Sequence, residues 1–134
     1  MKFLSAGEST DQAYTKELRE LLEAEWGVFG SFEQQDFGLK APFPIVAVEG
    51  DTLLGGLVFS LWQDPATKVA AIWINGLFVK PKYRNKGIAS SLVRCAMDGQ
   101  STLYVLTDVE PLYSSLGWQL LSRGKDGVVL RHQI

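Results

Sequence analysis

The chain has 134 residues, of which 46% are hydrophobic and 21% charged, and its formal net charge is −2. These values are typical of one soluble globular domain, so residues 1–134 are expected to form a single domain. The single cysteine, Cys95, excludes an intramolecular disulfide and a CxxC zinc site. No apolar run is long enough to span a membrane, and a pI of about 5.4 argues against a nucleic-acid surface. We therefore expect a cytoplasmic protein that binds neither membrane nor nucleic acid and holds no metal.

Charge is distributed unevenly along the sequence. Residues 1–51 contain 10 acidic and 4 basic side chains, whereas residues 52–134 contain 5 acidic and 9 basic ones. A solvated acidic helix beside a basic surface would explain this asymmetry, and so would a site for an anionic ligand.

The N-terminal third is expected to begin with a short strand at residues 2–6. Apolar residues then recur with a helical period between Tyr14 and Trp26, which predicts a helix that stops just after Trp26. A second, shorter helix is predicted to begin at Ser31 and to end before Gly38.

Three β-strands are predicted next, at residues 44–50, 52–62 and 68–79. The turns between them indicate antiparallel hairpins, and the glycine at position 76 indicates a β-bulge inside the third strand. Strand alternation would place four residues on one side of that strand, unless the bulge shifts the alternation. They are Trp73, Asn75, Leu77 and Val79.

In the C-terminal half, residues 88–98 have the period of a helix that ends at Gly99. The elements predicted after it are a strand at 101–107, a short helix at 110–117 and a hairpin of strands 118–123 and 127–133. The strands at 69–79 and 101–107 flank the helix and should be parallel neighbours in a βαβ unit. The predicted fold class is α/β (α+β), a mixed sheet with helices on both faces.

A basic segment connects the third strand to the helix at 88–98. Residues 79–89 read VKPKYRNKGIA and contain four cations, no carboxylate and one glycine. The first N–H groups of a helix have no partner within the helix and attract anions, so this segment suits a pyrophosphate. It matches neither the GxxxxGK[ST] loop nor the GxGxxG loop of nucleotide-binding proteins. A plain solvated turn is the alternative interpretation.

The same segment resembles the acyl-CoA loop of the GNAT superfamily of N-acetyltransferases, V-x-P-x-x-R-x-x-G-x-[GA], and the element order is similar to that of the GNAT fold. The resemblance implies a mostly antiparallel sheet with a splayed parallel strand pair that holds acetyl-CoA, the acyl donor. It implies that the pantetheine arm pairs with the strand at Leu77, Phe78 and Val79. The pyrophosphate would be held by the loop residues Arg84, Asn85, Lys86, Gly87, Ile88 and Ala89.

The string PLYSSLGW at residues 111–118 resembles a second hallmark of that family. The resemblance implies that Tyr113 is the general acid that protonates the thiolate leaving group. A core tyrosine on a short helix is the alternative. No general base is assigned: Asn75 stands where many relatives have an acid, and Asp108, Glu110 or a water relay remain open.

The acceptor is expected to be a primary amine, with a small molecule favoured over a peptide. Trp26, Phe29 and Asn75 are the candidate residues on the acceptor side, although the two aromatic residues would serve equally well as core anchors. A non-catalytic acyl-CoA-binding module is the alternative function, and a phosphate-transfer enzyme is a third. Dimers are common among similar proteins, so a homodimer stays open.

Overall fold

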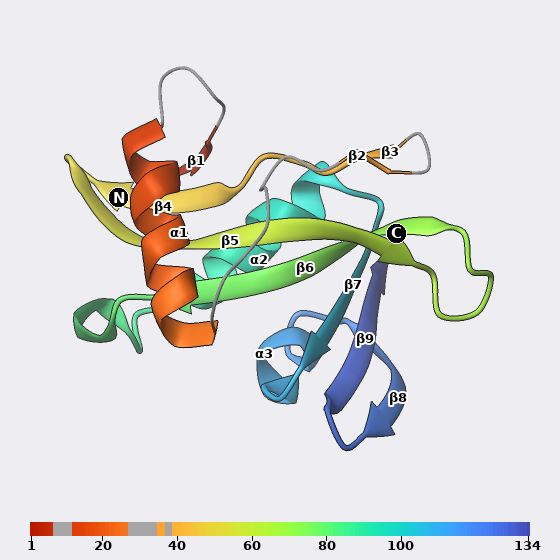
Figure 1. Ribbon diagram of the computed structural model, residues 1–134. Coiled ribbons are helices and arrows are strands. Elements are labelled where there is room, and N and C mark those ends of the chain that lie inside the picture. The colour runs from red at the N-terminus through yellow and green to blue at the C-terminus, as the bar shows by residue number, and fades with distance from the viewer. Residues whose placement is uncertain (7–11, 27–34, 37–38) are drawn as a thin grey trace.

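The computed structural model describes residues 1–6, 12–26, 35–36 and 39–134 (Figure 1). Its three helices are α1 (Gln12–Trp26), α2 (Ile88–Gly99) and α3 (Glu110–Ser114). The main sheet consists of β1 (Lys2–Ser5), β4 (Ile45–Glu49), β5 (Thr52–Gln63), β6 (Ala70–Val79), β7 (Thr102–Thr107), β8 (Gln119–Gly124) and β9 (Gly127–Gln133). The strand order in this seven-stranded sheet is β1-β4-β5-β6-β7-β9-β8.

All neighbouring strands of the main sheet are antiparallel except β6 and β7, which are parallel. Helix α2 connects these two strands, as the predicted βαβ unit requires. The fold class predicted from the sequence, a mixed and mostly antiparallel sheet with one parallel pair, is confirmed.

The second predicted helix is wrong at Gln35 and Asp36. These residues form strand β2 (Gln35–Asp36), which pairs with β3 (Leu39–Lys40) in a separate two-stranded sheet. The rest of the predicted helix lies outside the described residues. The prediction relied on a cap at Ser31, whereas a two-residue connection that contains Gly38 is the stronger signal and favours a hairpin.

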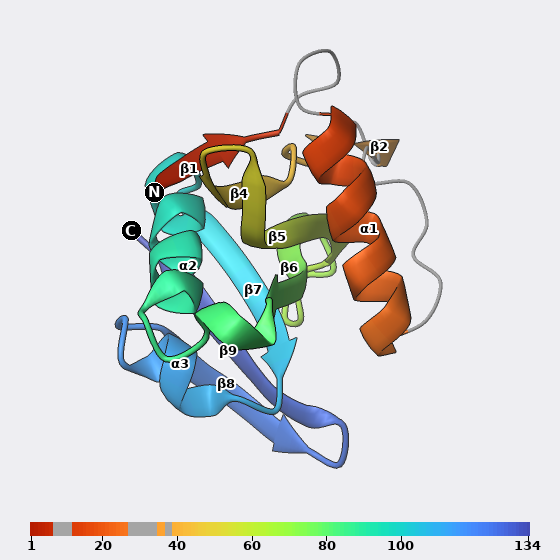
Figure 2. The ribbon, with the colours of Figure 1, turned by 90° about the vertical axis from the view of Figure 1, so that its left-hand side faces the viewer.

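The helices cover both faces of the main sheet, with α1 on one face and α2 on the other (Figure 2). Burial of apolar side chains between helix and sheet is the main stabilising term on each face. The α1 face is filled by Leu18, Leu22, Val46, Val48, Leu53 and Val58. The opposite face is filled from α2, α3 and the sheet by Leu57, Phe59, Leu92, Val93, Leu103, Tyr113 and Leu130. Within the described residues, no helix is long and apolar enough to cross a membrane.

The predicted β-bulge is present in β6. Val58 of β5 lies opposite Gly76 and the next residue, Phe59, lies opposite Ile74, so Asn75 is the extra residue. The bulge shifts the alternation of β6, because Ile74 and Leu77 both face the α2 side. Trp73 therefore points to the other side and does not share a side with Leu77 and Val79, which is the exception that the prediction from the sequence allowed for a bulge.

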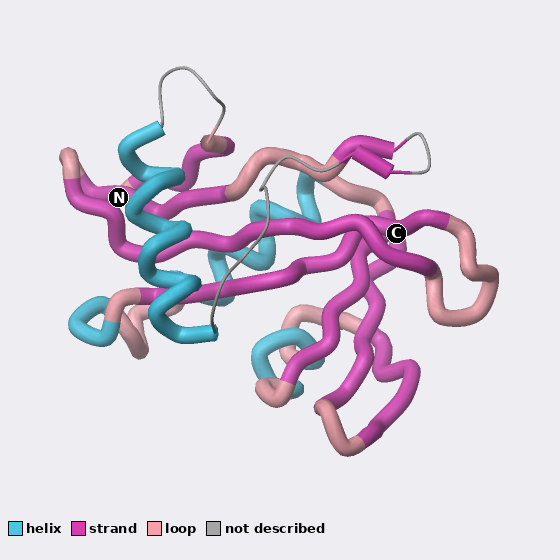
Figure 3. The backbone as a smooth tube through the Cα atoms, viewed as in Figure 1, coloured by secondary structure: helices cyan, strands magenta, loops and turns pink. Residues whose placement is uncertain are grey.

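Asp64 connects the β5–β6 hairpin loop to strand β7 by a hydrogen bond with Tyr104. The loop is seen in pink at the right of Figure 3. The Asp64 carboxylate accepts backbone N–H groups from Ala66 (2.8 Å) and Thr67 (3.0 Å) and a hydrogen bond from the Tyr104 hydroxyl. These donors, with the tyrosine first, lower the pKa of Asp64 to about 2. Tyr104 also stacks on Trp73 at a centroid distance of 5.2 Å, so the hairpin and β7 are joined by two side chains.

Candidate active site

The loop after β6 has the geometry of an anion cradle. A short 3₁₀ turn (Pro81–Tyr83) follows the strand, and Asn85 and Gly87 then adopt positive φ of 64° and 81°. The first helical hydrogen bond runs from the N–H of Ser91 to the carbonyl of Gly87, at 3.1 Å. The N–H groups of residues 88–90 therefore have no acceptor one turn back, and they present the positive end of the α2 dipole.

The four cations of this segment have different contacts. Lys80 forms an ion pair with Glu17 of α1 at 2.6 Å. Arg84 donates from Nε to the carbonyl of Val79 at 2.7 Å, and its guanidinium lies over the Phe78 ring at 5.3 Å. These two side chains therefore hold the loop against α1 and β6.

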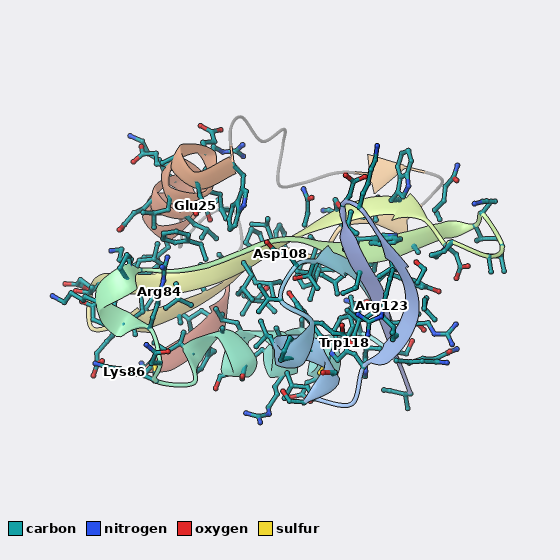
Figure 4. All side chains as sticks on the ribbon, turned by 90° about the horizontal axis from the view of Figure 1, so that it is seen from below. Glu25, Arg84, Lys86, Asp108, Trp118 and Arg123 are labelled. Atoms are coloured by element: carbon teal, nitrogen blue, oxygen red, sulfur yellow. The ribbon has the colours of Figure 1, made fainter. Side chains whose placement is uncertain are left out.

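The other two cations gather around one aromatic ring. The ammonium groups of Lys82 and Lys86 lie 5.3 and 5.9 Å from the ring centroid of Tyr83. Figure 4 shows Lys86 and Arg84 at the end of the molecule where α2 begins. The cradle is therefore formed by backbone N–H groups and flanked by lysine charge, while Arg84 is directed to the strand.

Strands β6 and β7 separate beyond a short contact. Their register consists of Trp73 opposite Tyr104 and Ile74 opposite Val105, and it ends at the bulge. A cavity of about 900 Å³ opens where the strands diverge. Residues from β5, β6, β7, α3 and β9 line it, among them Leu77 and Asn75. A gap of this kind offers unpaired strand backbone to an extended ligand.

Tyr113 lies in the wall of this cavity. Its side chain is 3% exposed and packs edge-on against Trp118 at a centroid distance of 5.1 Å. Burial raises the pKa of the Tyr113 hydroxyl above its ordinary value of 10. At neutral pH the phenol is protonated, as a tyrosine with the ordinary pKa would be, and this is the form that can donate a proton.

Of the two carboxylates considered as general bases, only one lines the cavity in the structure. Asp108 lines the cavity and lies near the middle of the molecule in Figure 4. Glu110 instead forms a bidentate ion pair with Arg123, at 2.7 and 3.1 Å, and does not line the cavity. Asn75, which the bulge displaces from the regular strand, lines the cavity as an exposed residue.

A further carboxylate, Asp126, was missed in the sequence and lines the same cavity. It belongs to the β8–β9 turn, whose next residue is Gly127. A Cβ placed on Gly127 would lie 2.6 Å from the Thr107 carbonyl oxygen and 3.6 Å from the Asp108 nitrogen. The turn therefore rests directly on the end of β7. The sequence predicted the turn but carried no signal for this long-range contact.

The other predicted residues are placed as follows. Trp26 lines the cavity and contacts Phe78 edge-on at 6.4 Å, whereas Phe29 lies outside the described residues. Ile88 is buried and Ala89 is half-buried against the core of the α2 face. Within the described part of the chain, no group of three or more His, Cys, Asp or Glu residues could hold a metal ion.

Comparison with protein families identifies the class of the chain. Residues 9–107 match the model of the Acetyltransferase (GNAT) family, which is well over half of the sequence. The chain therefore belongs to the GNAT family of acetyltransferases. A sequence comparison with the curated proteins found no match.

Solved structures share the fold. An acetyltransferase described as putative, yncA from Salmonella typhimurium with its cofactor acetyl-CoA, is 15% identical with a TM-score of 0.66, over 99% of this chain and 93% of that one. Naa50 from Arabidopsis thaliana with the bisubstrate analogue CoA-Ac-MVNAL is 15% identical with a TM-score of 0.62, over 99% and 98%. The GNAT family N-acetyltransferase YhbS from Escherichia coli, in complex with CoA, is 24% identical with a TM-score of 0.55. That match covers 67% of this chain and 57% of YhbS.

Proposed function

We propose that the protein transfers an acetyl group from acetyl-CoA to a primary amine, by direct attack of the amine on the thioester. In this proposal the pyrophosphate binds the backbone of residues 84–89, flanked by Lys82 and Lys86. The pantetheine arm enters the gap between β6 and β7 beside Leu77 and Phe78. The carbonyl of Val79 already accepts a hydrogen bond from Arg84, so it contributes less to this pairing than its neighbours do.

The proposed reaction balances as follows. The ammonium first loses one proton to a carboxylate or to water, and the amine nitrogen then forms a bond to the thioester carbon. The carbon–sulfur bond breaks, and the thiolate takes the proton of the Tyr113 hydroxyl. The nitrogen of the former amine then loses its second proton to the Tyr113 oxygen, which restores the tyrosine hydroxyl. The products are an N-acetyl amide, CoA with a free thiol and one proton released to solvent.

The observation that carries this proposal is the position of Tyr113. This buried tyrosine lines the cavity where the parallel strands diverge. Loss of its proton-donating group should slow the chemical step by roughly 10²- to 10⁴-fold.

The test is Tyr113→Phe, assayed by release of CoA thiol against a panel of primary amines. We expect kcat to fall by about 10²- to 10⁴-fold while the Kd for acetyl-CoA stays the same. Tyr14→Phe is the matched control, because Tyr14 lies on α1 and its hydroxyl donates to Gly50 at 3.4 Å. An unchanged kcat in Tyr113→Phe would refute the role of Tyr113. Binding of acetyl-CoA without turnover of any amine would favour the acyl-CoA-binding module.

A further inference from the structure

The cavity between β6 and β7 is rich in tryptophan on one side. Trp26, Trp62 and Trp73 all line it. Trp26 and Trp62 are 58% and 62% exposed, although large aromatic side chains usually lose most of their exposed surface on folding. Exposed aromatic rings at the mouth of a cavity are typical of a surface that a ligand covers.

Trp73 adds an independent sign of an unmet interaction. Among the residues that the structure describes, its indole Nε1 is buried and has no hydrogen-bond partner. A buried N–H without an acceptor is costly, and a carbonyl oxygen of the pantetheine arm, which shares this cavity in the proposed function, would be able to supply one.

The charge of the cavity has one sign. Asp108 and Asp126 are the acidic side chains among its described lining residues, which include no lysine, arginine or histidine. The segments 7–11, 27–34 and 37–38 also contain no basic residue in their sequence, so they bring no cation. Two nearby basic residues do not line the cavity: Lys125 belongs to the turn, and Arg131 donates to Gln119 at 2.7 Å.

Both aspartates line the cavity, Asp108 just after β7 and Asp126 in the β8–β9 turn. This turn packs on the end of β7, because a Cβ on Gly127 would lie 2.6 Å from the Thr107 carbonyl oxygen and 3.6 Å from the Asp108 nitrogen. The lining of the cavity therefore combines two carboxylates with a tryptophan-rich wall. Carboxylates bind an ammonium group, and the faces of tryptophan rings bind both cations and apolar rings.

We propose that the acetyl acceptor is a compact primary amine with an aromatic body and no carboxylate, its ammonium at Asp108 and Asp126 and its ring on the tryptophan wall. This inference rests on the proposed acetyl transfer and names its substrate class. A free amino acid would place its own carboxylate against the two aspartates and would be repelled. A peptide is disfavoured because the cavity must also receive the pantetheine arm.

The experiment compares matched pairs of acceptors, tryptamine with tryptophan and phenethylamine with phenylalanine, by kcat/KM. Spermidine, hexylamine and a neutral pentapeptide with a free N-terminus complete the panel. We expect each aromatic amine to exceed its amino acid, and each of the three other acceptors, by at least about tenfold, which corresponds to roughly 1.4 kcal/mol. Equal or better use of tryptophan, spermidine, hexylamine or the peptide would overturn the inference.

The double variant Asp108→Asn/Asp126→Asn tests the residues. We expect KM for tryptamine to rise at least about tenfold, and the preference for tryptamine over tryptophan to shrink, at an unchanged Kd for acetyl-CoA. The matched control is Asp51→Asn, on the exposed turn between β4 and β5. A preference for tryptamine that persists undiminished in the double variant would overturn the assignment.

Calorimetric titration with acetyl-CoA distinguishes failure of the proposed acetyl transfer from failure of the proposed acceptor class. Absence of acetyl-CoA binding would refute the proposed function and this inference together. Binding of acetyl-CoA with turnover of a different acceptor class would refute the inference alone. If acetyl-CoA binds and no amine is turned over, titration of the CoA complex with tryptamine and tryptophan decides, and failure to bind tryptamine more tightly overturns the inference.

Discussion

Gly87 combines a left-handed backbone with open space beside it. Its φ is +81°, and a Cβ on this residue would have no heavy atom within 4 Å. A side chain at this position would therefore be strained by about 1–2 kcal/mol but would meet no protein atom. It would instead project into the space that we assign to the pyrophosphate.

The pair Gly87→Glu and Gly87→Gln tests this assignment. Both variants should lose a similar 1–2 kcal/mol of unfolding free energy, roughly, because they share the backbone strain. Glu should weaken acetyl-CoA binding at least about tenfold more than Gln, because it adds a negative charge beside the phosphates. Calorimetry at two salt concentrations measures the difference, which should shrink at high salt. Equal affinities in the two folded variants would place the phosphates elsewhere.

The cations of residues 80–86 show which details of the site a sequence can give. The spacing of Arg84, Gly87 and Ala89 predicted a cradle at the start of a helix, and α2 does begin there. The different contacts of Lys80 and Arg84 were not predictable from the sequence. Lys80 reaches Glu17 because of how α1 packs on the sheet, and Arg84 reaches the carbonyl of Val79 because of the path of the loop.

At the scale of elements, the β5–β6 hairpin depends on an ionised Asp64. Its pKa in the folded state is lowered to about 2 from 3.8, so the folded state favours the carboxylate. The resulting stabilisation is fully present above about pH 5 and is lost as the pH falls through 3.8 towards 2.

Asp64→Asn should remove this dependence on pH. Between pH 5 and pH 2, we expect the melting temperature of the wild type to fall more steeply than that of the variant, with Asp51→Asn behaving like the wild type. Thermal unfolding followed by circular dichroism measures this. Parallel curves for the wild type and Asp64→Asn would contradict the role given to this carboxylate.

The β8–β9 turn is the element that completes the cavity, and Gly127 fixes its position. Gly127→Ala would place a Cβ 2.6 Å from the Thr107 carbonyl oxygen, so the turn must move away from β7. We expect a loss of about 1–3 kcal/mol in unfolding free energy and a higher KM for the amine, with little change in the Kd for acetyl-CoA. The control is Gly124→Ala, in the same hairpin, where the nearest atom would be 4.0 Å away. An unchanged KM in Gly127→Ala would separate the turn from the acceptor site.

Local sequence patterns predicted most helices and strands, but they did not predict contacts between segments that are distant in the sequence. The periods of residues 14–26 and 88–98 gave α1 and α2 nearly to the residue, since each helix buries one apolar face. The short pairing of β2 with β3 was missed, because the prediction relied on a helix cap at Ser31 and gave no weight to the two-residue connection that contains Gly38. Asp126 was missed because its place in the lining of the cavity depends on how the β8–β9 hairpin packs on the end of β7.

At the scale of the whole molecule, the sheet separates two apolar cores. Val46 belongs to the core under α1 and Val93 to the core under α2, and both are fully buried. Among the residues whose burial the structure describes, α1 and α2 share no cluster, so a cavity made on one face should leave the packing of the other unchanged.

Val46→Ala and Val93→Ala should each cost about 1–3 kcal/mol, from the buried methyl groups lost and the cavity that remains. The double variant should lose the sum to within roughly 0.5 kcal/mol. Urea unfolding of the four proteins measures this. A coupling above about 1 kcal/mol would mean that the sheet transmits strain between the two faces.

The charge asymmetry of the sequence also has a place in the whole molecule. The acidic first part contributes Glu17 on α1, and the basic later part contributes Lys80 after β6, and these residues meet in an ion pair of 2.6 Å. The pair is partly exposed, so it contributes at most about 1 kcal/mol, but it joins the two regions of opposite charge.

The extra residue in β6 has a consequence for how the gene can change. Deleting Asn75 would restore regular pairing with β5, with Ile74 still opposite Phe59 and Leu77 still opposite Leu57. Both halves of the strand would therefore keep their apolar side chains in the core under α2. The lost side chain is one that lines the cavity. Loss of this single codon is therefore expected to leave the fold intact and to change the acceptor side of the cavity instead.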